Sequence, residues 1–205
     1  MQITIVDYGM GNLGSIANMV HRLGHVAVIA SDAESIQHAE KIILPGVGSF
    51  DRGMKHLHEN GLVDVLNSKV MIEKIPVLGV CLGLQLMACK SEEGNLKGLA
   101  WLNTNVVKFD DNKTDEKIRI PHMGWNVVRV CTNNPLIQND GTQRFYFVHS
   151  YHLDTLPESQ CISVTHYGYD FISAVAFKNI FGVQFHPEKS HRYGLQLLKN
   201  FIEKI

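Results

Sequence analysis

The stretch PVLGVCLGLQL, residues 76–86, decides the fold that we expect for this chain. Its first half is a short aliphatic run, typical of a buried strand, and a second apolar run follows at once. Cys81 stands between Gly79 and Gly83 at the junction. Glycines on both sides of one residue allow a sharp turn from a strand into a helix. The stretch therefore predicts a strand–turn–helix unit with a cysteine at the turn.

Strands and helices alternate around this unit in the N-terminal half. We expect strands at 3–7, 25–30, 41–44 and 77–80, and helices over 13–23, from 31 onward, in two segments of 50–73, and over 82–90. Pro45 is expected to break the third strand, and Gly61 to split the helical segments. Such alternation is typical of βαβ units, so it predicts an α/β fold with a parallel sheet.

The C-terminal half has a different pattern, with the short β-rich runs NVVKF, WNVVRV, RFYFVHSY, CISVTHY, ISAVAF and IFGVQF. Lys178-Asn179 is expected to turn a hairpin between the last two. Ser190 is expected to cap a final helix with the apolar face Leu195, Leu198, Ile202 and Ile205. The charged stretch 108–119 is interpreted as a surface loop. Because no repeat or linker is visible, residues 1–205 are predicted to form a single domain.

Composition narrows the function classes. Lys and Arg total 19 and Asp and Glu total 20, a net charge of −1, which gives no electrostatic case for nucleic acid or an anionic membrane. No apolar run approaches the about 18 residues of a membrane span, and the N-terminus lacks the pattern of a signal peptide. The four cysteines show no CxxC, and the eleven histidines show no zinc spacing. We therefore expect free thiols, no metal and a cytoplasmic protein.

The Gly-x-Cys-x-Gly pattern has the form of a nucleophile turn in which sulfur replaces oxygen. A thiol at the start of a helix lies near the positive end of the helix dipole, which favours the thiolate of Cys81. The backbone N–H of Leu82 is free to bind an oxyanion. A buried structural cysteine, which is our interpretation of Cys89, is the alternative that this motif alone leaves open.

A cysteine nucleophile needs a base, and the best candidate lies in GVQFHPEKS, residues 182–190. Pro187 keeps His186 extended, so His186 and Glu188 point to the same side of the chain. Glu188 can then bind one imidazole nitrogen while the other faces the cysteine, as in a catalytic triad. Taken alone, the triplet would also fit a strand end with a solvated carboxylate.

The loop in KIILPGVGSFD, residues 41–51, is a third candidate. Glycines on both sides of Val47 let its peptide turn without steric penalty, so the Val47 N–H is a candidate second oxyanion donor. An ordinary strand-to-helix turn is the structural alternative.

Six motifs between residues 7 and 190 resemble the class I glutamine amidotransferases, the Cys-His-Glu family. They are DYGMGNL (7–13), LPGVGSF (44–50), GVCLGLQL (79–86), PHMGWN (121–126), FYFVHSY (145–151) and GVQFHPEKS (182–190). Within that family, PHMGWN and FVHSY resemble the glutaminase subunits of imidazole glycerol phosphate synthases. The resemblance implies a three-layer α/β fold with a mostly parallel central sheet flanked by helices and with β-rich C-terminal additions.

The resemblance also implies a reaction. Cys81 would attack the side-chain amide of glutamine, His186 would pass the thiol proton to departing ammonia, and water would hydrolyse the thioester to glutamate. No cofactor is implied. The positions that match the family's substrate-binding residues are Gly48, Gln85, Ser150 and Tyr151.

A partner follows from the same resemblance. Ammonia would pass to a (βα)₈-barrel cyclase in a heterodimer, giving imidazole glycerol phosphate and a purine precursor in histidine biosynthesis. The positions that match the family's docking and signalling contacts are Asn12, His122, Trp125, Tyr146 and Lys189. We also hypothesise that the Val47 peptide is turned away from the site until docking. A paralogous ammonia donor, for example for surface-sugar amidation, would carry the same triad.

Three other functions stay open at this level. Gly9-Met10-Gly11-Asn12-Leu13-Gly14 satisfies G-x-G-x-x-G, and Asp32 lies near the spacing of a ribose-binding acid, which would fit a nicotinamide-binding protein. Against this, Asp7 and Tyr8 place bulk and negative charge just before the turn. A cysteine peptidase or other thiol hydrolase, and a catalytically silent interaction module, are the remaining alternatives.

Overall fold

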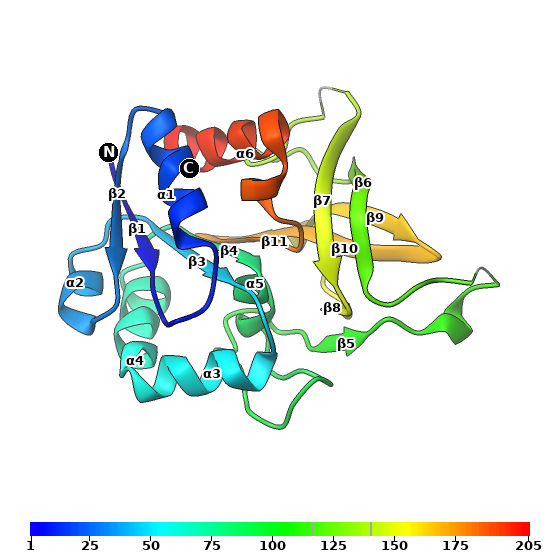
Figure 1. Cartoon of the computed structure of the whole chain (residues 1–205), viewed down its shortest axis with the longest axis horizontal. Helices are drawn as coiled ribbons and strands as arrows, with labels where there is room; N and C mark the ends of the chain where they lie inside the picture. The colour runs from blue at the N-terminus through cyan, green and yellow to red at the C-terminus, as the bar shows by residue number, and fades with distance from the viewer. Residues whose placement is uncertain (116, 140) are drawn as a thin grey trace.

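The strands of the computed structural model, which describes residues 1–115, 117–139 and 141–205, form one large and one small sheet (Figure 1). The large sheet contains β1 (Gln2–Val6), β2 (Val26–Ala30), β3 (Ile42–Gly46), β4 (Val77–Cys81), β6 (His122–Val130), β7 (Gln143–His149), β9 (Cys161–Tyr167), β10 (Tyr169–Phe177) and β11 (Ile180–Val183). The small sheet pairs β5 (Val106–Lys108) with β8 (Tyr151–Leu153). The expected strands of both halves are therefore confirmed, with ends shifted by a few residues.

The helices also fall where the sequence places them. They are α1 (Leu13–Arg22), α2 (Ala33–Gln37), α3 (Phe50–Glu59), α4 (Leu62–Asn67), α5 (Leu82–Leu86) and α6 (His191–Lys204). A π-helical turn, Ser68–Ile72, follows α4, and 3₁₀ turns occupy Asp111–Lys113, Glu158–Gln160 and Pro187–Lys189. Gly61 separates α3 from α4 as expected, whereas α5 is shorter than the range 82–90. Among the described residues, no helix is long and apolar enough to cross a membrane.

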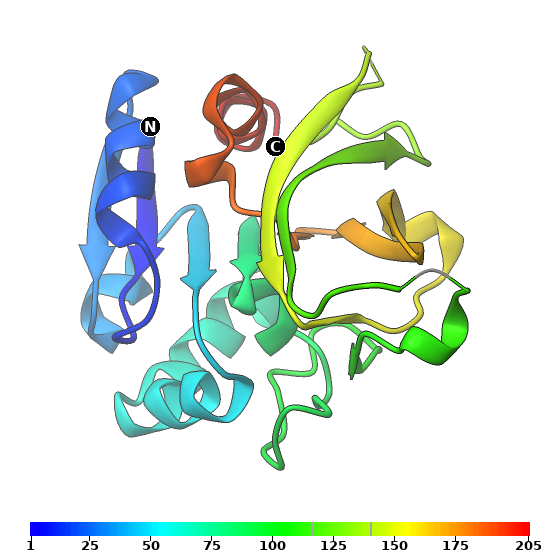
Figure 2. The same cartoon turned by 45° about the vertical axis from the view of Figure 1, so that its right-hand side comes forward.

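The large sheet has the strand order β2-β1-β3-β4-β11-β10-β9-β6-β7. The part from β2 to β11 is parallel, and the strands from β11 to β7 are antiparallel. Helices α1 and α6 cover one face of the parallel part, and α3, α4 and α5 cover the other (Figure 2). The fold is thus the expected three-layer α/β arrangement with β-rich additions. The Lys178-Asn179 turn between β10 and β11 is also confirmed.

Alternation along the strands divides the core between the two faces of the sheet. In β3, Ile43 packs in the cluster that contains α1 and α6, while Ile42 and Leu44 pack in the cluster that contains α3 and α4. Successive side chains of a strand point to opposite faces, so strands covered on both faces are apolar at every position. This explains why β3 and β4 read as continuous apolar runs.

Pro45 does not break the third strand, which is a correction to the sequence analysis. Strand β3 continues to Gly46, and Pro45 pairs in register with Val80 of β4. Successive residues of a strand direct their backbone nitrogens to opposite neighbouring strands. The Ile42 N–H donates toward β4, so Pro45, three residues later, directs its nitrogen toward β1. The β1 ladder already ends at Ile43. The missing N–H of Pro45 therefore costs no ladder hydrogen bond.

The C-terminal helix packs through a face slightly different from the expected one. Leu198 and Ile202 are buried as expected, whereas Leu195 and Ile205 are partly exposed. Leu197 and Phe201 fill the core in their place.

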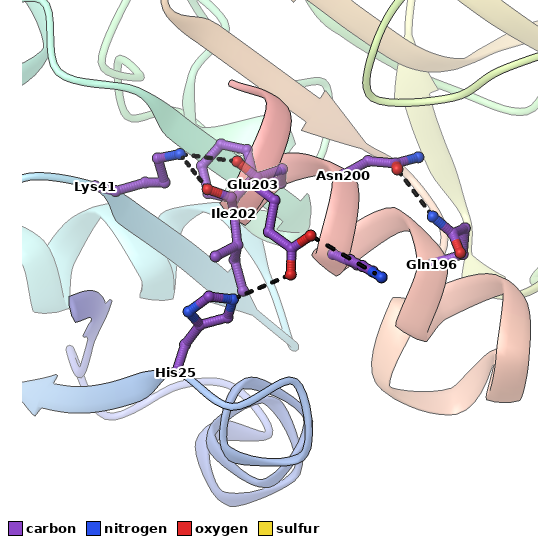
Figure 3. Close-up of polar contacts among 8 residues, drawn as sticks. His25, Lys41, Gln196, Asn200, Ile202 and Glu203 are labelled. Atoms are coloured by element: carbon purple, nitrogen blue, oxygen red, sulfur yellow. Dashed lines mark hydrogen bonds and ion pairs between the residues drawn. The ribbon is translucent and has the colours of Figure 1, made fainter. Parts of the chain in front are cut away.

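The last turn of α6 is fixed to the strand region by a buried lysine. Lys41 is 5% exposed, and its Nζ donates to the carbonyl oxygens of Phe201 and Ile202, each at 2.9 Å (Figure 3). The last carbonyls of a helix have no partner within the helix, and a cation there also complements the helix dipole. His25 adds a surface contact to Glu203 at 3.3 Å.

Candidate active site

Cys81 occupies the turn between β4 and α5 in a conformation that non-glycine residues rarely adopt. Its φ and ψ angles are 53° and −109°, and its side chain is only 6% exposed. Residues held in such strained conformations concentrate at functional sites. Leu82 is the first residue of α5, so its N–H has no acceptor within the helix.

The flanking glycines are required by the close packing of α5 on two strands. A Cβ atom on Gly83 would lie 1.8 Å from the carbonyl oxygen of Leu44. One on Gly79 would lie 2.8 Å from the backbone nitrogen of Leu84. The Gly-x-Cys-x-Gly pattern therefore reflects steric exclusion on both sides of the turn.

His186 and Glu188 form a buried pair after β11. The Nδ1 atom of His186 lies 2.8 Å from Oε1 of Glu188, and the two side chains are 1% and 2% exposed. His186 is extended, with φ −101° and ψ 99°, and Pro187 begins the following 3₁₀ turn. The Nε2 atom makes no hydrogen bond to the described residues, so it is the ring nitrogen left for Cys81.

Ser190 holds this segment in place rather than capping α6. It stands at the N-cap position, but its hydroxyl makes no capping bond. Instead it donates to the His186 carbonyl at 2.6 Å and accepts from the Tyr146 N–H at 3.0 Å. The expected N-cap position is therefore confirmed, but the side-chain capping bond is absent because His186 and Tyr146 engage the hydroxyl.

The environment of His186 favours its protonated form. Burial lowers the pKa of His186, but its interactions with nearby Cys81 and with the bound Glu188 carboxylate outweigh burial and raise this pKa to about 10. Tyr8 lies in the same region, and its hydroxyl donates to the Pro45 carbonyl at 2.7 Å. Burial, and then the proximity of Cys81, raise the pKa of Tyr8 well above its usual value. Tyr8 therefore stays neutral.

A pocket of about 320 Å³ joins the candidate residues. It is lined by Val47, Gly48, Cys81, Leu82, Gln85, Glu93, Pro121, Val148, His149, Ser150, Tyr151 and His186. The structure thus brings the predicted nucleophile, base, oxyanion donors and substrate-binding positions to one cavity. Glu188 does not line this pocket and binds His186 from outside it.

The loop that carries Val47 is shaped by a second turn. Gly48 has a φ of 105°, and a Cβ atom there would lie 2.7 Å from the methyl group of Met10. Val47 itself is 43% exposed. A backbone that only glycine adopts readily therefore places the Val47–Gly48 peptide at the mouth of the pocket.

Gln85 and Gln184 connect the pocket wall to the nucleophile. Gln85 Nε2 donates to the Tyr151 carbonyl at 2.9 Å and to Gln184 Oε1 at 3.2 Å. Gln184 is fully buried, and its Nε2 lies 3.7 Å from the Cys81 sulfur. Sequence reasoning singled out Gln85 but missed Gln184, although it stands in the quoted motif GVQFHPEKS.

Glu93 is a pocket residue that sequence reasoning also missed. Its Oε2 accepts from the Phe50 N–H at 2.8 Å, where a carboxylate complements the N-terminus of α3. Its neighbour Glu92 has the same side chain but lies outside this pocket. The sequence around Glu92 and Glu93 does not show which of them enters the pocket. The packing of their loop against α3 determines it.

Three of the five predicted interface positions gather on one surface. Trp125 is 40% exposed and meets the Tyr146 ring edge-on, with ring centroids 6.3 Å apart. Lys189 is exposed, and its Nζ lies 5.7 Å from the Tyr146 ring centroid. Asn12, at the start of α1, is exposed as well.

His122 is the exception and corrects the prediction. Its side chain is 3% exposed and stacks on Phe147, so it cannot touch a partner directly. Strand β6 alternates, and Met123 and Trp125 point outward where His122 points into the core.

The charged stretch 108–119 is more than a surface loop. Phe109 is 2% exposed and packs against a cluster of rings that includes His149 and His152. This burial corrects the interpretation for that residue. Residue 116, which belongs to the same stretch, lies outside the described residues.

The glycine turn after β1 has structural partners that explain its sequence. Asp7 Oδ1 accepts from the Gly9 N–H at 2.9 Å, and Asp32 accepts from the Ser35 N–H at 2.8 Å as the cap of α2. Tyr8 is fully buried behind the turn. The G-x-G-x-x-G pattern and its acid are thus engaged in the fold, which argues against the nicotinamide-binding alternative.

Comparisons with known proteins give a consistent result. The family model "Glutamine amidotransferase class-I" matches residues 4–205. The chain is 52% identical over 203 residues to imidazole glycerol phosphate synthase subunit HisH 2 of Methanococcus maripaludis, covering 98% of this chain and 99% of the relative. It is 47% identical over 204 residues to the protein of the same name from Pseudomonas aeruginosa, covering 99% of this chain and 100% of the relative.

Solved structures share the fold at low identity. PurLQS from Thermotoga maritima matches with a TM-score of 0.74 and 15% identity, covering 99% of this chain and 98% of that chain. A glutamine amidotransferase from the same organism matches with a TM-score of 0.64 and 18% identity, covering 100% of this chain and 81% of that chain.

Proposed function

Because the chain belongs to the class I glutamine amidotransferase family, we propose that it is the glutaminase subunit of an imidazole glycerol phosphate synthase in histidine biosynthesis. One observation carries the chemistry: Cys81 shares a pocket with His186, whose other ring nitrogen is bound by a buried carboxylate. The pathway is supported by two HisH 2 subunits that are 52% and 47% identical to this chain over nearly its full length.

In the first step, the Cys81 sulfur attacks the side-chain amide carbon of glutamine. His186 Nε2 has already taken the thiol proton in the resting pair, and it delivers this proton to the amide nitrogen as the C–N bond breaks, so that ammonia leaves. Glu188 holds the imidazole orientation through Nδ1 and stabilises its positive charge. The N–H groups of Leu82 and Val47 would stabilise the negative charge on the amide oxygen.

In the second step, water attacks the glutamyl thioester. His186 removes a proton from the water, the C–S bond breaks, and the thiol is restored as glutamate leaves. The pocket residues Gly48, Gln85, Ser150 and Tyr151 would bind the substrate. Glu93, the acidic residue of the lining, is the natural acceptor for the α-ammonium group of glutamine.

Ammonia would pass to a (βα)₈-barrel cyclase, with this chain and the cyclase forming a heterodimer. The surface of Trp125, Tyr146 and Lys189, together with Asn12, is the proposed docking face. The cysteines are free, which fits a reducing cytoplasm. The Val47 peptide is proposed to turn toward the oxyanion only on docking, which would prevent the waste of ammonia.

The test mixes the chain with a barrel cyclase and the nucleotide ligand of the cyclase, and measures glutamate release. Cys81→Ala is expected to lower this rate by about 10⁴-fold or more, as losses of a nucleophile do. Synthesis from added ammonium salts should continue, because the cyclase needs only ammonia. Cys89→Ala is the matched control, since its thiol contacts a backbone carbonyl away from the pocket.

Two results would count against this assignment. Full glutamate release by Cys81→Ala would reject the nucleophile. Equal rates with and without the cyclase would reject the docking role of the Val47 peptide.

A further inference from the structure

Two buried histidines outside the proposed triad face each other across two strands. His122 of β6 and His149 of β7 stand directly opposite in the register and are 3% and 6% exposed. His149 lines the candidate active site, whereas His122 lies behind it. The proposed reaction assigns neither residue a role.

Their hydrogen bonds admit one assignment of protons. His149 Nδ1 lies 2.8 Å from the Tyr151 carbonyl oxygen, which only accepts, so Nδ1 carries the proton. In the neutral ring, Nε2 must then accept, and its neighbour at 3.1 Å is His122 Nδ1, which must donate. His122 Nε2 accepts in turn from Asn126 Nδ2 at 3.2 Å.

Two observations support the neutral rings. Asn126 Nδ2 also donates to the His166 carbonyl at 2.9 Å, which fixes the amide orientation that the chain requires. Burial lowers the pKa of His122 to about 4. Burial also lowers the pKa of His149 well below its usual value, against the opposing effect of the Tyr151 hydrogen bond.

The chain of bonds ends on the carbonyl that shapes the pocket. The Tyr151 oxygen accepts from His149 on one side and from Gln85 on the other. These two donors fix the plane of the peptide that follows Tyr151, and Ser150 and Tyr151 form one wall of the pocket. Through Gln85 and Gln184, the same network reaches the Cys81 sulfur.

We propose that His149, held in its Nδ1–H tautomer by His122, is a positioning residue that fixes the Tyr151 carbonyl and thereby the glutamine-binding wall. This inference rests on the proposed glutaminase function. It predicts that loss of the His122 donor weakens glutamine binding and leaves the chemical step nearly unchanged, because neither ring touches the reacting atoms.

The chain offers a matched pair of variants. His122→Phe keeps a ring stacked on Phe147 but removes the donor to His149. His152 is also buried and packs on the same Phe109 ring, but it bonds Tyr169 and the Leu153 carbonyl instead. His152→Phe therefore removes a buried imidazole from the same aromatic cluster without breaking the network.

The experiment measures KM and kcat for glutamine with the cyclase present, and the melting temperature of each variant. His122→Phe is expected to raise KM about two- to tenfold, the range that one net hydrogen bond covers, with little change in kcat. His152→Phe should leave KM unchanged. A second pair guards against misfolding: His149→Asn can still donate to Tyr151, so it should bind glutamine more tightly than His149→Leu.

A readout without activity completes the test. Side-chain ¹⁵N spectra of the wild-type chain should show His149 protonated at Nδ1, and His122→Phe should shift the His149 Nε2 resonance, because this nitrogen loses its donor. An Nε2–H tautomer in the wild type, or equal KM values for His122→Phe and His152→Phe, would overturn the inference. Glutamate release by the wild-type chain tests the proposed function separately. If the wild type is active but His122→Phe and His152→Phe have equal KM values for glutamine, the inference fails and the proposed function stands.

Discussion

At the residue scale, the site depends on how a buried imidazole is surrounded. His186 has a carboxylate on one side and the Cys81 sulfur on the other, and its side chain is only 1% exposed. Because water does not reach this ring, nearby charged and hydrogen-bonding groups stabilise the imidazolium in place of solvation. A histidine that carries its proton at neutral pH beside a sulfur is suited to protonate a departing amine.

This raised pKa predicts a pH dependence of stability. The folded chain binds the proton on His186 more tightly than the unfolded chain, in which an ordinary histidine titrates near 6.5. The stabilisation is complete below pH 6.5, declines above it, and is lost as pH rises through about 10. The free energy of unfolding of the wild type minus that of His186→Asn should therefore fall between pH 6.5 and 10.

Chemical unfolding at several pH values checks this expectation. Glu188→Gln should reduce the size of the decline, because it removes one of the two partners that raise the pKa. A difference between wild type and His186→Asn that stays constant across this window would contradict the proposed pairing.

At the element scale, the decisive unit is β4 followed directly by α5. The helix starts at the residue after the nucleophile, so it must cross β3 closely enough that Gly83 meets the Leu44 carbonyl. The turn and the packing are thus the same constraint, which is why one short motif specifies both.

Gly83→Ala should be strongly destabilising. Its new Cβ would overlap a backbone oxygen that belongs to a central strand and has no room to move. We expect a loss of about 3 kcal/mol or more in the free energy of unfolding, or no folded protein. Gly14→Ala is the control: it lies in α1 with nothing within 4 Å of the new atom, and it should stabilise by about 0.5–1 kcal/mol. Similar unfolding curves for the two variants would refute the steric argument.

The anchor between Lys41 and α6 gives a second prediction at this scale. Lys41→Met removes a buried cation and leaves two helix-terminal carbonyls without their donor. We expect the free energy of unfolding to fall by about 1–3 kcal/mol. Lys199→Met, which removes an exposed ion pair from the same helix, should change it by less than about 0.5 kcal/mol. Denaturant titration measures the free energy of unfolding of both variants. An equal loss in the two would show that the buried Lys41 contact contributes no more to stability than the exposed ion pair of Lys199.

At the scale of the whole molecule, the sheet brings distant segments to one edge. The nucleophile comes from β4, the base from the segment after β11, and the substrate wall from the end of β7 and the start of β8. Strand β7 curves away from the parallel part of the sheet (Figure 2). Carboxyl ends of parallel strands meet at one edge of an open sheet, where sites form by preference. The β-rich additions then close the pocket from the opposite side.

The same architecture leaves the outer face of β6 available for a partner. Met123, Trp125 and Val127 are 61%, 40% and 43% exposed along one strand. Trp125→Ala is expected to weaken cyclase binding tenfold or more, about 1.4 kcal/mol, as central aromatic residues of interfaces do. Ile29→Ala, at a similarly exposed position on the opposite edge strand β2, should leave the affinity unchanged. Titration calorimetry distinguishes the two, and equal affinities would place docking elsewhere.

Sequence alone determined the features that depend on near neighbours. Short continuous apolar runs predicted the strands, because a strand covered on both faces is apolar at every position. Apolar residues at helical spacing predicted the helices. The spacing of Gly79, Cys81 and Gly83 predicted the turn, and that of His186 and Glu188 predicted their contact. Each of these patterns is enforced within a few residues, so it is visible in the chain itself.

Tertiary structure decided what depends on residues far apart in the chain. Pro45 stays within β3 because the β1 ladder ends before it, and the inward face of β6 is the one on which His122 stacks against Phe147 of β7. Glu93 enters the pocket while Glu92 does not, and the Tyr151 carbonyl accepts from Gln85 of a helix in the other half of the chain. In each case the deciding energy is a clash, a buried hydrogen bond or a missing ladder partner supplied by another segment, and no local pattern encodes that neighbour.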